Sequence, residues 1–142
     1  MRALNTIDYT EARQMIDAIV AEVSKAGGAA VIAVADPWGE LIAFARMDGA
    51  PVSSIRIAAN KAYSAARERK TTEEIGQKAR HPEKGFDTAW FGDDRFLGWG
   101  GGVPVWRNGQ VIGAIAISGL PQAEDIRLAT WAANLIQNEG PI

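Results

Sequence analysis

The stretch GGGVPVWRNGQVIGAIAIS, residues 100–118, contains the clearest indication of a fold in this chain. Asn108-Gly109 lies between two apolar runs, and this dipeptide favours the tight turn of a β-hairpin. Residues 103–107 and 110–118 are therefore predicted to be antiparallel strands. Three glycines precede the first strand, where glycine permits a positive φ or a close approach of the backbone. Because a strand and not a helix follows them, a phosphate-binding loop is excluded here.

Four helices are predicted outside this hairpin. Apolar residues spaced three and four apart indicate helices over residues 8–26 and 53–70, and a last helix that begins at Pro121. Thr71, with an acidic residue three positions later, indicates a short helix to about Ala79. The helix over residues 53–70 presents mainly alanine on its apolar face, so we expect it to lie close to its neighbour.

Two further parts of the chain predict strands. In residues 29–46, Asp-Pro-Trp-Gly separates two apolar segments, which indicates a second hairpin. Residues 95–99 predict one more strand, after a long polar loop over residues 80–94. Hairpins without strand–helix alternation are typical of one antiparallel sheet. The predicted fold class is α+β, a five-stranded antiparallel sheet flanked by helices, in a single domain over residues 1–142.

The composition excludes several classes of function. Fifteen basic and 17 acidic residues give a net charge of −2, and without a long basic run we expect no nucleic-acid partner. The densest basic cluster, residues 66–70, is interpreted as complementing the negative end of a helix. The lack of cysteine excludes a disulfide and a thiolate nucleophile. No apolar run approaches the roughly 20 residues of a membrane span, and no signal peptide is recognised, so we expect a cytoplasmic protein without a membrane partner.

Two cations are candidates for binding an anion. Arg46 lies where a predicted strand ends, and its guanidinium would clamp a carboxylate. An ion pair with Asp48 that closes the turn is the competing interpretation. Lys61 lies beside the alanine stripe, from which its ammonium would reach the same anion, and a lysine that extends into solvent explains the position equally well.

Aromatic residues gather around the three glycines. Trp90, Trp99 and Trp106, with two phenylalanines among them, exceed what a small sheet needs for its own packing. They are candidates for the wall of a cavity or for an interface, and the alternative is that they all belong to the core. Tyr63 would offer its phenol to a ligand or a metal, with plain packing as the alternative.

His81 is the only histidine. It is therefore a candidate metal ligand and, with Asp48, a candidate catalytic residue for proton transfer. The competing interpretation is a solvent-exposed loop histidine without a role. One histidine excludes a multi-histidine zinc site within one chain.

Four motifs together resemble the GlcG/HbpS-type haem-binding family, which is related to the C-terminal domain of PduO-type proteins. The motifs are VADPWGELIAFARMDGA (residues 34–50), SIRIAANKAYSAA (54–66), GGGVPVWRNGQVIGAIAISG (100–119) and AEDIRLA (123–129). The resemblance covers nearly the whole chain.

This resemblance implies a profilin-like sandwich that assembles into homo-oligomers, from dimers to octamers, and some members bind haem. The matching positions, carried over from the family's motifs, are Asp36, Gly39, residues 46–49, Lys61, Ala62, Gly100, Gly101, Gly102, Val103, Pro104 and residues 113–119. Residues 80–95 depart from the family's pattern. With cysteine absent, the candidate iron ligands are His81, Tyr63, Tyr9 and Met47, and the choice among them is left open because family members differ in how they hold the iron.

The sequence leaves functions of different classes open. The first is an oligomeric binding protein for haem or a similar anionic small molecule, for which the resemblance implies an accessory role in a catabolic pathway. The second is a small catabolic enzyme, an isomerase, lyase or hydratase, in which Arg46 and Lys61 hold a carboxylate while His81 or Asp48 moves a proton. A third is an accessory subunit whose exposed aromatic residues pair with another protein.

Overall fold

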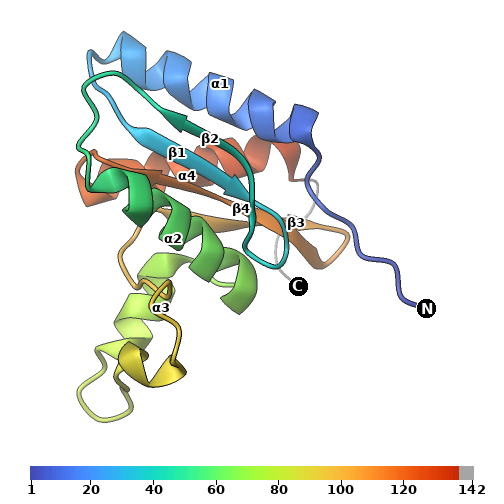
Figure 1. Ribbon diagram of the computed structural model, residues 1–142, viewed down its shortest axis with the longest axis vertical. Coiled ribbons are helices and arrows are strands. Elements are labelled where there is room, and N and C mark those ends of the chain that lie inside the picture. Colours follow the sequence, from blue (N-terminus) through green and yellow to red (C-terminus); the bar gives the residue numbers. More distant parts are fainter. Residues whose placement is uncertain (138–142) are drawn as a thin grey trace.

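The computed structural model describes residues 1–137, and these form a four-stranded antiparallel sheet with helices on both faces (Figure 1). The strands lie in the order β2-β1-β4-β3. In chain order the elements are α1 (Tyr9–Lys25), β1 (Val31–Ala35), β2 (Leu41–Arg46), α2 (Ser54–Glu68), α3 (Thr72–Ala79), a 3₁₀ turn (Thr88–Phe91), β3 (Gly102–Arg107), β4 (Gln110–Ser118) and α4 (Gln122–Ile136).

The helix and hairpin predictions are confirmed, because local chemistry fixes these elements. The Asp8 side chain accepts a hydrogen bond from the third residue of its helix at 2.7 Å, and Thr71 caps α3 in the same way at 3.1 Å. Asn108 and Gly109 both have positive φ, 52° and 73°, as the two-residue hairpin turn requires.

The two faces of the sheet carry side chains of different size. Isoleucine and valine fill the face under α1 and α4, including Ile32 of β1 and Ile115 of β4. The opposite face is largely alanine, with Ala33 and Ala116 packed against the alanine stripe of α2. Small residues on both sides let the α2 backbone approach the sheet closely, as the sequence predicts, so polar side chains on α2 lie near the strands.

The prediction of a fifth strand is wrong. Residues 95–99 form an irregular segment whose backbone groups bond to side chains. The Ser64 hydroxyl donates to the carbonyl oxygen of Arg95 at 3.2 Å and accepts from the amide of Leu97 at 2.9 Å. Arg80 donates to the carbonyl oxygen of Gly98 at 3.2 Å. The segment is therefore held to α2 and to the end of α3 without joining the sheet.

Within residues 1–137, no helix combines the length and the apolar character that a membrane crossing demands.

Candidate binding site

Lys61 is buried and satisfied by the protein itself. Its ammonium donates to the carbonyl oxygen of Ile117 at 2.9 Å and to Oδ2 of Asp125 at 3.4 Å, and the indole of Trp99 lies 5.6 Å from it. Burial lowers the pKa of Lys61 and raises the pKa of Asp125 to about 6. This ammonium links α2 to β4 and α4, and it has no free donor directed at solvent.

The three consecutive glycines border the same internal contact. A β-carbon on Gly100 would lie 2.7 Å from the side chain of Ile126. On Gly101 it would lie 2.6 Å from the backbone oxygen of Ile117, and on Gly102 it would lie 2.7 Å from the backbone oxygen of Lys61. The next residue but one, Pro104, is buried in β3. The close approach expected at the glycines is therefore an approach to the protein's own atoms. The three glycines line none of the larger grooves in residues 1–137, whereas Pro104 lines a groove between β3 and α4.

Arg46 and Asp48 lie at the surface. Arg46 ends β2 opposite Val31, so it points to the face of the sheet that α2 covers. Its side chain makes no ion pair within residues 1–137, the predicted pair with Asp48 included. Because Lys61 is enclosed and Arg46 is exposed, the structure does not bring the two cations together.

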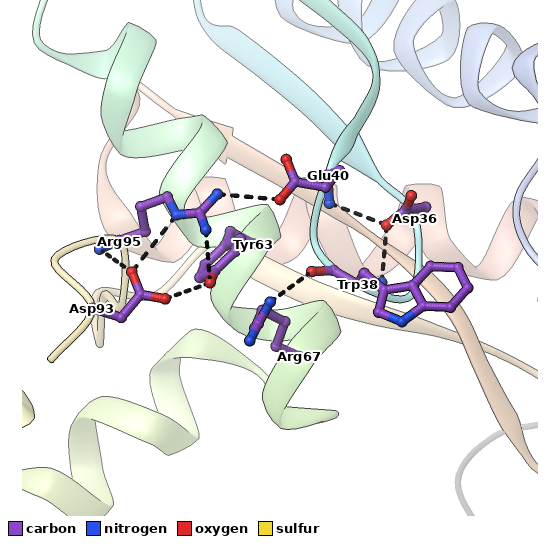
Figure 2. A network of polar contacts seen from close by, with 7 residues as sticks. All are labelled: Asp36, Trp38, Glu40, Tyr63, Arg67, Asp93 and Arg95. Carbon is purple, nitrogen blue, oxygen red and sulfur yellow. Dashed lines mark hydrogen bonds and ion pairs between the residues drawn. The ribbon is translucent and has the colours of Figure 1, made fainter. Parts of the chain in front are cut away.

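Tyr63 ties α2 to the loop that follows α3 (Figure 2). Its hydroxyl donates to Asp93 and accepts from Arg95 at 3.0 Å, while Arg95 also pairs with Glu40 at 3.3 Å. Burial, followed by the bond to Asp93, raises the pKa of Tyr63, and the phenol holds the pKa of Asp93 below its usual range. This hydroxyl is fully engaged within the protein.

His81 and Trp90 are exposed in the loop after α3. The imidazole Nδ1 accepts backbone hydrogen bonds from Glu83 at 3.2 Å and Lys84 at 3.0 Å, so the single proton of the neutral ring lies on Nε2. Neither ring nitrogen then offers a free lone pair. Trp90 is 89% exposed and Trp99, which covers Lys61, is 52% exposed.

The β1–β2 turn, the β3–β4 hairpin and the N-terminal segment lie at the same end of the sheet (Figure 1). Residues of these segments and of the end of α2 line a groove of about 820 Å³. We call it the tryptophan groove. It is lined by Arg2, Ala3, Leu4, Pro37, Trp38, residues 66–70, Trp106 and residues 109–111. Its size falls within the roughly 300–1,000 Å³ of pockets for small organic ligands.

Trp38 is presented by a rigid turn. Asp36 Oδ1 accepts from the amides of Trp38 at 2.9 Å and Glu40 at 3.1 Å (Figure 2). Gly39 has a φ of +90°, and a β-carbon there would lie 2.7 Å from the ring of Tyr63. The turn is thereby pressed against α2, and the indole of Trp38 remains 57% exposed beside the groove.

The opposite wall comes from the β3–β4 hairpin. The pairing register shifts between Val105 and Trp106, a bulge of the kind that redirects a side chain. The backbone amide of Trp106 donates to Oε1 of Gln137 at 3.1 Å. Trp106, which follows this bulge, is the second tryptophan that lines the groove.

Cations line the same groove as these two tryptophans. Arg2, Arg67, Arg69 and Lys70 line the groove with Glu68 as the only acid, and none of the four forms an ion pair within residues 1–137. The end of α2 adds about half a negative charge, so roughly two and a half positive charges remain.

Two of these cations have unusual settings. Arg67 donates to the carbonyl oxygen of Trp38 at 3.4 Å, with its guanidinium 4.8 Å from the ring centre of Tyr63. Arg69 ends α2 in the left-handed conformation, φ 57° and ψ 37°. That conformation costs a residue other than glycine about 1 kcal/mol, and such strain often accompanies a functional position.

Sequence reasoning did not assign the groove, since it interpreted residues 66–70 as complementing a helix dipole. The left-handed conformation of Arg69, next to three other cations, marks the groove in the structure. The residue types in the sequence do not reveal that conformation. No group of three or more histidine, aspartate or glutamate side chains in the described part of the chain is arranged to hold a metal ion.

Residues 7–134 match the family model described as haem degrading protein HbpS-like. The chain belongs to this family. It is 36% identical to protein GlcG of Escherichia coli K12 over 110 residues, which are 75% of this chain and 79% of GlcG. The crystal structure of Klebsiella pneumoniae protein ORFY has a TM-score of 0.87 at 34% identity, covering 94% of this chain and 92% of that one. A structure of a PduOC–haem complex has a TM-score of 0.85 at 25% identity, covering 95% of this chain and 97% of that one.

Proposed function

We propose that this chain binds haem or a similar flat anion with an apolar body, and that the tryptophan groove is the binding site. The observation that carries the proposal is the pairing of two indoles, Trp38 and Trp106, with four cations that have no carboxylate partner in residues 1–137. A haem molecule offers the complement, a wide aromatic ring and two carboxylates. Indoles bind flat rings, and guanidinium groups bind carboxylates in a fork geometry.

Membership of the HbpS-like family and the similarity to a PduOC–haem complex support haem as the first ligand to test. The residues fit two parts of that molecule, its ring and its carboxylates. They do not offer the iron a ligand, because the groove contains no histidine, methionine, tyrosine or cysteine. We therefore propose binding of the ring and the carboxylates, and no reaction at the iron.

The test is a titration of the whole chain with haemin, followed through the Soret band. We expect saturable binding at one haemin per chain. Removing two groove cations together, Lys70→Ala and Arg2→Ala, is expected to weaken binding about tenfold, since exposed charge pairs contribute up to about 1 kcal/mol each. Trp38→Leu removes one ring contact and is expected to weaken it by a similar factor.

Arg46→Ala is the matched control, because it removes an exposed cation that does not line the groove. It also tests the site predicted from sequence. Arg46→Ala removes one charge and the double groove variant removes two, so a loss of binding free energy in Arg46→Ala that is half the loss in the double variant would show that only net charge matters. No spectral change at tens of micromolar haemin would rule out the proposal.

A further inference from the structure

The four side chains predicted from the sequence to be candidate iron ligands each have a contact elsewhere in this fold. The hydroxyl of Tyr63 donates to Asp93, and Nδ1 of His81 accepts from two backbone amides. Tyr9 accepts a hydrogen bond from Arg13 on the surface of α1 at 3.2 Å. Met47 packs, half-buried, against the apolar core.

None of the four also lines the tryptophan groove. Coordination by Tyr63 would break its bond to Asp93, leaving a carboxylate without its donor. Coordination through Nε2 of His81 would move the ring proton to Nδ1 and break both bonds that Nδ1 accepts. An axial bond from any of these residues would therefore require rearrangement of a segment that already has its hydrogen bonds.

We infer that the tryptophan groove recognises dicarboxylate tetrapyrroles through their ring and their carboxylates, whether or not a metal occupies the centre. This inference rests on the proposed function and narrows its ligand class. Trp38 and Trp106 contact the ring faces, and Arg69 and Lys70 neutralise the carboxylates. No bond to iron contributes to the affinity.

The test compares three probes on the whole chain, by quenching of tryptophan fluorescence. They are haemin, metal-free protoporphyrin and the dimethyl ester of that porphyrin, in which both carboxylates are masked. We expect the first two to bind within about threefold of each other and the ester at least about tenfold more weakly, because the ester retains the ring and loses both charges.

A second measurement records the Soret maximum of the haemin complex. The variants His81→Ala, Met47→Leu and Tyr63→Phe are each expected to leave the Soret maximum unchanged. His81 is exposed, so its replacement leaves the fold intact even if Tyr63→Phe disturbs it.

The outcomes separate the two claims. Binding of haemin without binding of the metal-free porphyrin, or a Soret shift in any one variant, overturns this inference and leaves the proposed function standing. Failure of all three probes to bind overturns both. Equal binding of the ester and the free acid overturns the role of the carboxylates.

Discussion

The ammonium nitrogen of Lys61 lies 3.4 Å from Oδ2 of Asp125, and only 2% and 4% of the two side chains are exposed. The pair joins α2 to the first turn of α4 across the end of β4, where the carbonyl oxygen of Ile117 takes a second hydrogen bond from the ammonium. Removing two charges from water is costly, and this arrangement returns part of the cost through hydrogen bonds.

Replacing only one residue of this pair is expected to lower the free energy of unfolding more, per residue replaced, than replacing both. Lys61→Met leaves a buried carboxylate and Asp125→Asn leaves a buried ammonium, so each should lower the free energy of unfolding by about 3–5 kcal/mol. The double variant should lose clearly less than the sum. Urea unfolding of the four proteins measures this.

The control is the same cycle on the exposed pair of Arg127 and Glu124, which should show little coupling. Additive losses at Lys61 and Asp125 would mean that the two side chains do not interact in solution.

The pH dependence of stability should reveal the raised pKa of Asp125. Its folded value of about 6 exceeds the ordinary 3.8, so the folded state holds a proton that the unfolded state releases between these values. Stability therefore falls as the pH rises through this window. We expect the unfolding free energy of the wild type, minus that of Asp125→Asn, to fall by on the order of 2 kcal/mol between about pH 4 and pH 6 and then level off.

Urea unfolding at a series of pH values tests this expectation. The subtraction cancels the carboxylates whose pKa is lowered, such as Glu124 and Asp93, which titrate in both proteins. A difference that grows with pH would indicate a lowered pKa for Asp125 and contradict the burial argument.

Gly101 should tolerate no side chain. It has a φ of +127°, and a β-carbon would lie 2.6 Å from the oxygen of Ile117 and 2.7 Å from the ammonium of Lys61. Gly101→Ala is expected to cost about 3 kcal/mol or more, since strain and a backbone clash add. Gly92→Ala is the matched control, with a φ of +69° and open space around it, and should cost about 1 kcal/mol. Similar melting temperatures for the two variants would disprove the crowding at Gly101.

The elements that the sequence predicts well are those fixed by neighbours in the chain. The caps at Asp8 and Thr71 and the turn at Asn108-Gly109 use partners within three residues. The predicted strand at residues 95–99 fails because Ser64, about 30 positions earlier, takes its backbone groups. Strand propensity does not show a competing partner so far away.

The candidate site follows the same rule. The alanine stripe correctly places Lys61 near the sheet, but its partner Asp125 is 64 positions away and is not visible in any local pattern. The tryptophan groove joins four separate segments, so neither Trp38 nor Arg69 is marked by sequence spacing. The motifs nevertheless identified the family correctly, because they run through nearly the whole chain.

Arg69 is expected to lower the stability of the fold and to strengthen haemin binding. As the left-handed end of α2, it carries strain of about 1 kcal/mol that glycine would not. Arg69→Gly is therefore expected to raise the free energy of unfolding by about 1 kcal/mol and to weaken haemin binding about threefold to fivefold, since one cation leaves the groove. Arg69→Lys is the control, because it retains both the strain and the charge and should change each quantity little. Chemical unfolding and Soret titration on the same samples measure both. A glycine variant that gains stability and binds haemin as tightly as the wild type would remove Arg69 from the site, and one that loses stability would refute the strain.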